Sequence, residues 1–386
     1  MSDAYISPQP MAATEPDPLA SLFSGDDKGS SRMFAILQDP EVTQVCINRH
    51  DRIFYWDSGG QKIVNDRLFQ GPTQYLAWLD KLLALTDAGW RHVEAARTSV
   101  IEASFLADTT ELHGSIHILT SEVTRGEPTL TVRKQPREVI TLDDMLRQGM
   151  MNEDMRLFLQ QAVHGRLNMA ISGGSGDGKT TMARALSAYI DPSNRVITVE
   201  EIDELHLQDS LPNVVGMTSF RSRDEEGRIV REATVEDLVR EALRMRPDRI
   251  WVGETRGKEA YALCKACNSS HDGSVTTVHA DNGAQAVRQL VTYVMESGLT
   301  EFVARDQVSR AFHLVIQVSK AKMGRRIISE ITELEPVLEG SQQRSVTLWR
   351  FNSDTEEFEF GSRPTRRLTE ALGRYGVNFD DLTGLH

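Results

Sequence analysis

The chain contains the stretch Gly173-Gly174-Ser175-Gly176-Asp177-Gly178-Lys179-Thr180, followed by Thr181. It fits G-x-x-x-x-G-K-[ST], the pattern of a phosphate-binding loop. Glycines let the backbone curl so that successive N–H groups point at one anion, and the N-terminus of a following helix adds partial positive charge. In such loops the lysine neutralises β- and γ-phosphate oxygens, and the hydroxyl binds Mg²⁺. The stretch therefore predicts binding of a nucleoside triphosphate with Mg²⁺ through Lys179 and Thr180.

The flanking residues favour this interpretation over a glycine-rich turn that binds nothing. Asn168 to Ser172 is a short, mostly apolar run typical of a strand. After Thr181, apolar residues recur at helical spacing until Asp191-Pro192, which ends the helix. Strand, glycine loop and helix follow one another in the order that phosphate binding requires.

Two further apolar runs end in acidic residues. Arg195 to Val199 leads into an acidic cluster that contains Glu200 and Glu204, and Ile250 to Val252 leads into Gly253 and Glu254. The carboxyl ends of strands are where an α/β sheet binds its ligand, so we expect these acids near the loop. Glu254 would orient the attacking water or help to hold Mg²⁺, together with Glu200. The alternative for the acidic cluster around Glu200 and Glu204 is a solvated charged turn. The alternative for Glu254 is a surface acid at the end of a strand.

A histidine and two cysteines are the other candidates for chemistry. Ser274 to Val278 is typical of a buried strand, and His279 follows it at the same expected sheet edge, where it would contact the γ-phosphate. Cys264 and Cys267 form a C-x-x-C pattern. The chain has only one other cysteine and the segment is predicted to be helical, so we expect these two to pack in the core.

The composition places the chain among soluble globular proteins. Its 386 residues leave room for two domains, and 40% hydrophobic with 26% charged residues is ordinary for such proteins. Three cysteines do not make a disulfide framework, and we see no signal peptide or bilayer-spanning run, so we expect a cytoplasmic protein. The net charge of −13 argues against general affinity for nucleic acid.

The pattern of strands and helices divides the chain into five segments. The fold class is α/β, with an N-terminal α+β domain, then a P-loop ATPase domain with a mostly parallel sheet, and a small C-terminal extension. The predicted segments are a disordered leader (1–31), the N-terminal domain (32–134), a linker (135–150), the ATPase domain (151–335) and the extension (336–386). Within 221–231 we expect a polar loop rich in arginine.

These motifs together resemble the secretion ATPases of type II secretion, type IV secretion and type IV pilus assembly, and most of all those of the Tad (Flp) pilus. The resemblance runs from about Met33 to the C-terminus. Four segments carry it: the phosphate loop, the acidic cluster from Thr198 to Leu205, the phrase from Arg244 through Gly257, and His271 through Ala280. It implies a RecA-like ATPase domain that works in a hexameric ring and docks on a membrane-embedded platform protein.

The resemblance also implies roles for individual residues. Glu254 would be the general base, and Glu200 and Glu204 would help to place Mg²⁺ and water. His271 and His279 would form a histidine box. The arginines that would contact phosphate are Arg133, Arg221 and Arg223. Asp177 departs from the family, which usually has a small residue at this position. A carboxylate beside a polyphosphate is repelled unless it points away or pairs with a cation.

The leading hypothesis is a cytoplasmic motor that hydrolyses ATP to drive pilus assembly or secretion, recruited to the inner face of the membrane by its partner. One alternative is an ATPase of a type IV secretion or conjugation system that works with nucleic-acid transfer machinery. Another is a weakly catalytic scaffold, which Asp177 suggests. A GTPase is disfavoured because no N-K-x-D phrase occurs.

Overall fold

The structure is a computed structural model that describes residues 28–57, 60–86, 93, 100–105, 114–134, 140–223, 229–337 and 344–379. The described chain forms two compact units, one built from the residues before 138 and one from the residues after it. None of the helices in this described part combines the length and the hydropathy needed to cross a bilayer.

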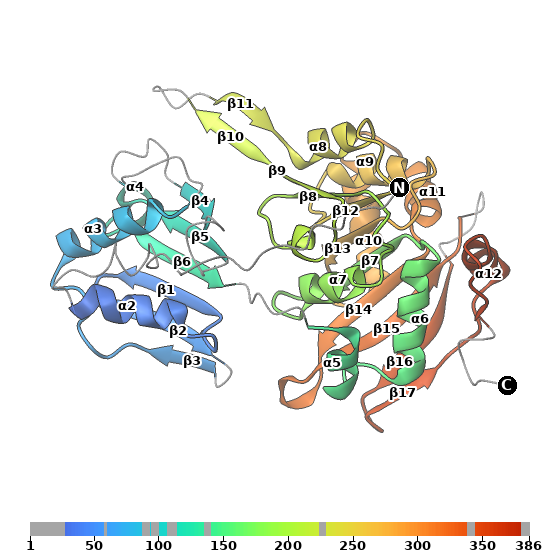
Figure 1. Ribbon diagram of the computed structural model, residues 1–386, viewed down its shortest axis with the longest axis horizontal. Coiled ribbons are helices and arrows are strands. Elements are labelled where there is room, and N and C mark those ends of the chain that lie inside the picture. Colours follow the sequence, from blue (N-terminus) through green and yellow to red (C-terminus); the bar gives the residue numbers. More distant parts are fainter. Residues whose placement is uncertain are drawn as a thin grey trace, which may run out of the picture. The chain divides into compact units, whose positions relative to one another are not determined.

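The first unit is an antiparallel sheet with helices packed on it (Figure 1). The strand order in the sheet is β3-β2-β1-β6-β5-β4. The strands are β1 (Gln44–Arg49), β2 (Arg52–Asp57), β3 (Gly60–Ile63), β4 (Val100–Ser104), β5 (Gly114–Leu119) and β6 (Thr129–Lys134), and the helices are α2 (Lys28–Gln38), α3 (Pro72–Leu83) and α4 (Ser121–Thr124). Helix α2 begins inside the segment predicted as a leader, whose first 27 residues lie outside the described part.

The core of this unit is formed by the inward-facing side chains of its strands and helices. In β1 and β5 every second side chain faces inward, among them Val45, Ile47, Ile116 and Ile118. The apolar side of α3, with Trp78 and its neighbours, packs into the same cluster. The unit therefore has a hydrophobic core of its own.

The second unit is built on a nine-stranded sheet in the order β17-β16-β15-β14-β7-β13-β12-β8-β9. From β14 through β9 neighbouring strands are parallel, whereas β14 to β17 form an antiparallel meander. The strands are β7 (Met169–Gly173), β8 (Val196–Glu200), β9 (Val214–Thr218), β12 (Arg249–Val252), β13 (Val275–His279), β14 (Leu314–Lys320), β15 (Arg326–Leu334), β16 (Ser345–Asn352) and β17 (Glu357–Phe360).

Helices cover both faces of this sheet (Figure 1). On one face, residues of α5, α6, α7 and α12 share a core with Met169, Ile171 and Trp251; on the other, α8 to α11 pack with Ala170 and Ile250. Neighbouring strand residues thus point to opposite faces, as the pleat requires. The helices are α5 (Leu142–Arg147), α6 (Glu153–His164), α7 (Lys179–Ser187), α8 (Val235–Ala242), α9 (Glu259–Cys267), α10 (Gly283–Met295), α11 (Glu301–Ala311) and α12 (Arg366–Gly373), with 3-10 turns η1 (Leu207–Asp209) and η2 (Lys322–Gly324).

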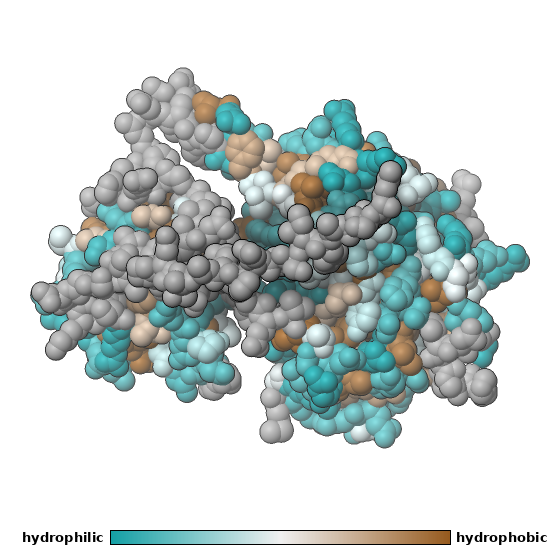
Figure 2. All heavy atoms as spheres, viewed as in Figure 1, coloured by the Kyte–Doolittle hydropathy of each residue, from teal (hydrophilic) through white to brown (hydrophobic). Residues whose placement is uncertain are grey.

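Two features of this unit differ from the expected pattern. The predicted polar loop at 221–231 is a β-hairpin, β10 (Phe220–Arg223) paired antiparallel with β11 (Ile229–Ala233). Apart from the half-buried Ala233, the described side chains of these strands are exposed, so they lack the alternation that reveals a strand. Figure 2 shows apolar surface on the hairpin, from Phe220, Ile229 and Val230. The residues predicted as a C-terminal extension supply β16, β17 and α12, which continue the same sheet and core.

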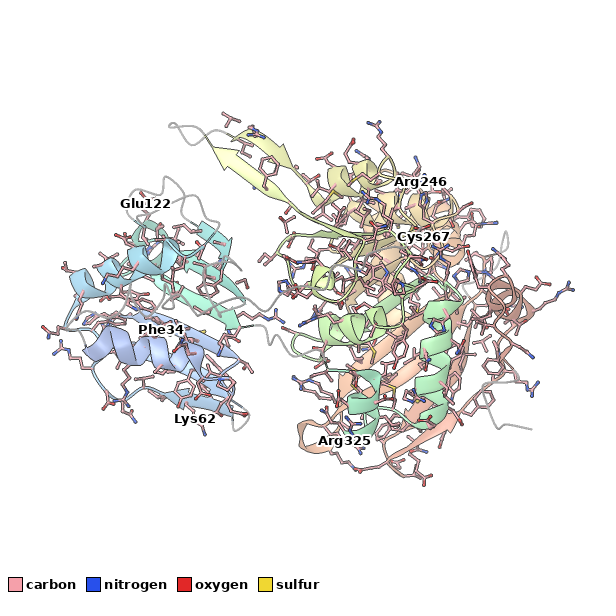
Figure 3. The ribbon with its side chains drawn as sticks, viewed as in Figure 1. Phe34, Lys62, Glu122, Arg246, Cys267 and Arg325 are labelled. Carbon is pink, nitrogen blue, oxygen red and sulfur yellow. The ribbon has the colours of Figure 1, made fainter. Side chains whose placement is uncertain are left out.

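The local sequence explains where two helices begin, and the prediction that both C-x-x-C cysteines pack in the core is confirmed. Thr141 and Thr234 cap α5 and α8 through capping boxes with Asp144 and Asp237. The C-x-x-C cysteines are buried in α9, where Cys267 (Figure 3) is 5% exposed. The fold class predicted from the sequence is therefore correct.

Candidate functional site

The glycine stretch forms the connection between β7 and α7, as expected. Gly176 and Gly178 have φ values of 73° and 100°, a conformation that residues with a Cβ rarely adopt. Gly178 is the N-cap of α7, so the loop's backbone leads directly into the helix N-terminus. Ser175 is exposed and Thr181 is half-buried in the first turn. This backbone is suited to hold an anion.

Two side chains at the start of α7 face the loop and the acidic cluster. The Nζ atom of Lys179 donates hydrogen bonds to the carbonyl oxygens of Gly173 and Gly174, at 3.1 and 3.0 Å. Thr180 Oγ1 lies 3.3 Å from Glu204 Oε2. The structure therefore brings together the ammonium, a hydroxyl and a carboxylate, which are the groups that a Mg²⁺–triphosphate complex requires.

Glu200 occupies a different environment from the one expected of a metal ligand. Its side chain is 3% exposed, and its Oε1 accepts the backbone N–H groups of Glu204 and Leu205, both at 3.1 Å. Burial, reinforced by the negative charge of Asp203, raises the pKa of Glu200 well above its usual value. A Cβ at position 253 would lie 2.8 Å from Glu200 Oε1, so Gly253 makes room for this carboxyl. The geometry favours Glu204 over Glu200 beside the metal.

Glu254 lies at the end of β12 and is held by an arginine. Its Oε2 accepts a hydrogen bond from Arg256 at 2.7 Å, while the other terminal nitrogen of Arg256 lies 2.9 Å from Glu201 Oε2. The Glu254 side chain is 29% exposed, so water reaches it. A carboxylate at this position can accept a proton once Arg256 moves away.

The two histidines lie at opposite ends of β13. His279 is its last residue, pairs in register with Gly173 of β7 and is exposed. His271 precedes the strand and its Nδ1 lies 3.2 Å from the carbonyl oxygen of Ala266 at the end of α9. Because β7 and β13 are parallel, His271 lies at the edge of the sheet opposite to the phosphate loop. The structure brings His279 to the site and does not bring His271 there.

Hydrogen bonds to backbone oxygens fix these strand ends relative to one another. Gly253 N donates to Val199 O, Thr277 Oγ1 donates to Gly253 O, and Ala280 N donates to Gly173 O. The loop, Glu254 and His279 therefore share the carboxyl edge of adjacent strands β7, β13, β12 and β8. This is the location at which open α/β sheets bind ligands.

The predicted arginines belong to other elements than the strands of this edge. Arg221 of β10 pairs with Glu232 of β11. The side chain of Arg223 lies outside the described residues, although its backbone belongs to β10. Arg133 belongs to β6 of the first unit, where it pairs in register with Gln44 and Ser115. Their contact with phosphate stays a prediction.

Sequence reasoning missed two cations beside the loop. Lys320, the last residue of β14, lies 3.5 Å from Asp177, and Arg326, the first of β15, donates to the carbonyl oxygen of Gly176 at 3.4 Å. Locally, the sequence shows only that they flank a short connection between two apolar runs. Their proximity to the loop depends on the pairing of β14 with β7, which sequence patterns do not specify.

The residues present fit a nucleoside triphosphate with Mg²⁺. The fit rests on left-handed glycines, an N-terminal helix turn and a lysine and a threonine at the positions where such loops bind phosphate and metal. Among the described residues no three His, Cys, Asp or Glu side chains gather as a ready metal site. The metal would therefore be held jointly by Thr180, nearby carboxylates and the phosphates, as is usual for Mg²⁺.

Known proteins show similarity over most of the second unit. A family profile described as type II/IV secretion system protein matches residues 113–353. The conjugal transfer protein TrbB of Rhizobium radiobacter is 31% identical over 211 residues, covering 54% of this chain and 61% of TrbB. The PtlH homolog of Bordetella bronchiseptica, a type IV secretion system protein, is 28% identical over 339 residues, covering 81% of this chain and 91% of the relative.

The structural comparison agrees on the fold. The pilus retraction motor PilT, solved with bound ADP, superposes with a TM-score of 0.52 at 14% identity, covering 87% of this chain and 84% of that one. Some curated relatives match over 24% and 51% of their own length, so the chain spans about half of them or less. The profile match covers more than half of the residues, and the chain belongs to the type II/IV secretion system protein family, the secretion ATPases.

Proposed function

We propose that this protein is an ATP-hydrolysing motor subunit of a secretion or pilus-assembly machine. The observation that carries the proposal is the phosphate loop, with Lys179 and Thr180, on the same sheet edge as Glu254. Membership of the secretion ATPase family supports it. The proposal includes assembly into a ring, hexameric by resemblance, in the cytoplasm against a membrane-embedded partner.

The chemistry would be an in-line attack of water on the γ-phosphorus. The new P–O bond forms as the bond to the β–γ bridging oxygen breaks, giving ADP and inorganic phosphate, and the water's proton passes to the Glu254 carboxylate. Lys179 would leave its loop carbonyls and move its charge onto the phosphate oxygens. Mg²⁺, held beside Thr180 and Glu204, would supply further neutralisation of phosphate charge.

Before Glu254 can accept a proton, its bond to Arg256 must loosen. Arg256 lies between Glu254 and Glu201, so a small rotation would leave it paired with Glu201 alone. His279, exposed at the end of β13, would sense the γ-phosphate as a hydrogen-bond donor.

A phosphate-release assay on the purified full chain tests the proposal. We expect Mg²⁺-dependent release of phosphate from ATP by the wild type, and none above background with Lys179→Ala, because the ammonium is lost from the phosphate site. Binding of ATP without release by the wild type would favour the scaffold alternative. Absence of both binding and release would contradict the nucleotide site.

A second candidate function is an ATPase that serves conjugation. The similarity to the conjugal transfer protein TrbB favours it. The net charge of −13 weighs against direct contact with nucleic acid. We expect hydrolysis to be insensitive to single- and double-stranded DNA at about 0.15 M salt; several-fold stimulation by DNA would favour the conjugation role with direct contact.

A further inference from the structure

The acidic residue inside the phosphate loop makes specific contacts. Asp177 stands immediately before Gly178, and its side chain is 15% exposed. Its Oδ2 accepts the backbone N–H of Gly174 at 2.8 Å. A Cβ at position 174 would lie 2.9 Å from that same oxygen, closer than real Cβ contacts, so the contact requires glycine at 174. The carboxylate thus closes the loop across three residues.

The second oxygen of this carboxylate faces a cation from another strand. Lys320 Nζ lies 3.5 Å from Asp177 Oδ1, and a Cβ at Gly176 would lie 3.6 Å from the same Nζ. Lys320 pairs in register with Arg326, which donates to the carbonyl oxygen of Gly176 at 3.4 Å. The turn end of the β14–β15 hairpin therefore contacts the loop at two points.

This hairpin end is itself held in place. Arg325, labelled in Figure 3, lies 3.9 Å from Glu356 and stacks over the Phe351 ring at 5.6 Å. Strand β14 also pairs directly with β7, the strand that leads into the loop. Lys320 and Arg326 thus come from a part of the sheet that is fixed relative to the loop.

The balance of charge explains how the loop accommodates a carboxylate. An unpaired carboxylate a few ångströms from a triphosphate would repel it, because like charges in a partly desolvated site interact strongly. Lys179, whose Nζ bonds to the carbonyls of Gly173 and Gly174, would move its charge onto the phosphate oxygens when nucleotide binds. Lys320 contacts Asp177 directly and Arg326 adds a second positive charge on the same side.

We propose that Asp177 is a positioning residue that fixes the curvature of the phosphate loop through Gly174, and that Lys320 is the cation that makes a carboxylate compatible with bound triphosphate. The second half rests on the proposed function, binding of ATP at this loop. The first half concerns the nucleotide-free protein alone. The two halves have separate tests.

Hydrogen exchange resolved to single amides tests the positioning role without nucleotide. Asp177→Ser removes the acceptor within reach of Gly174 and should speed exchange of the Gly174 amide at least about tenfold. Asp177→Asn keeps an acceptor oxygen of the same reach and should preserve most of the protection. Equal exchange in the wild type and both variants would overturn the positioning role, whatever the protein does with ATP.

A double-mutant cycle on Mg²⁺–ATP affinity tests the role of Lys320. Lys320→Gln should raise the dissociation constant about tenfold in the wild-type background, because it leaves Asp177 unpaired. In the Asp177→Ser background the same change should raise it less than about twofold. The matched control is Lys322→Gln, which removes a cation of the same connection that bonds to Ser353 O and not to the loop; it should leave the affinity unchanged.

The outcomes separate the two claims. An equal loss of affinity on Lys320→Gln in both backgrounds would mean that Lys320 contacts the nucleotide itself, and would overturn its pairing role while the proposed function stands. No effect in either background would overturn it as well. A wild type that binds no ATP would refute the proposed function and with it the role of Lys320, while the exchange experiment still decides the role of Asp177.

Discussion

Four glutamates lie at or just after the ends of strands β8 and β12, and their surroundings differ. Glu200 is buried and accepts two backbone N–H groups, Glu204 lies beside Thr180, and Glu201 and Glu254 share Arg256. Residue type alone makes these four equivalent. Position in the fold places Glu200 in the turn that follows β8 and Glu204 beside Thr180. Under the proposed function Glu204 would lie near the metal and Glu254 near the attacking water.

The buried state of Glu200 predicts a pH-dependent stability. Its raised pKa means that the native state keeps a proton that the unfolded chain releases near its ordinary value of 4.5. This carboxyl's contribution to stability is therefore full below pH 4.5 and is lost as pH rises through the native pKa. Glu200→Gln keeps an oxygen that can accept both N–H groups but does not titrate.

We expect the free energy of unfolding of Glu200→Gln, relative to that of the wild type, to increase as the pH rises above 4.5. Urea unfolding of both proteins at a series of pH values measures this difference. A difference that stays constant with pH would show that Glu200 titrates alike in the folded and unfolded chain.

The contact between Thr180 and Glu204 predicts a defect in metal binding. Glu204→Gln keeps the shape and the acceptor but removes a negative charge near the cation, so we expect the Mg²⁺ concentration for half-maximal ATP hydrolysis to rise roughly fivefold. Titration of activity with Mg²⁺ measures it. Asp209→Asn, an exposed acid in η1, should not shift the midpoint. An unchanged Mg²⁺ midpoint in Glu204→Gln would mean that Glu204 does not help to bind the metal.

At the scale of elements, the local signals in the sequence were strong where the chain carries caps and apolar periodicity. Thr141, Thr234 and the alternation in β1 and β5 specify their elements from nearby residues. The β10–β11 hairpin could not be predicted in this way, since its residues are exposed on both faces. The β14–β15 contact with the loop depends on long-range strand pairing.

The candidate site, too, was predictable only where nearby residues specify the structure. The phosphate loop, Glu254 and His279 were predictable because each follows a recognisable buried strand. His271 was placed wrongly beside them, because a short sequence separation from His279 conceals the full length of β13 between the two residues. Lys320 and Arg326 were missed because they approach the loop only through the long-range pairing of β14 with β7 and of β15 with β14.

His313, which lies just before β14, forms a hydrogen bond with Asn168, which lies just before β7. Its Nδ1 accepts the backbone N–H of Asn168 at 3.0 Å, and burial lowers the pKa of His313 to about 3. The unfolded chain binds this proton near pH 6.5 and the native state does not. Stability due to His313 is therefore present above pH 6.5 and is lost as pH falls towards 3.

His313→Asn places an oxygen near the position of Nδ1 without the proton-binding ring. Below pH 6.5 we expect the stability of the wild type to fall relative to this variant, with a slope that approaches about 1.4 kcal/mol per pH unit. Urea unfolding between pH 4 and 7 measures the slope. Parallel pH profiles for the two proteins would contradict a neutral buried imidazole.

At the scale of the whole molecule, the chain combines two units with separate cores, and the sheet edge that carries the phosphate loop belongs to the second. In the proposed motor, hydrolysis at this edge would move one unit against the other and so do work on a partner, a hinge mechanism common to such enzymes. The family assignment is to the type II/IV secretion system proteins, and under the proposed function the machine would be one for secretion, pilus assembly or conjugation.

The measurement that tests the central claim most directly is ATP binding and turnover by Glu254→Gln, compared with the wild type. Because the glutamine cannot accept the proton of water but leaves the phosphate loop intact, we predict an ATP affinity within about threefold of the wild type and turnover at least about 100-fold lower. Turnover comparable to the wild type would contradict the assignment of Glu254 as the base and of this sheet edge as the catalytic site.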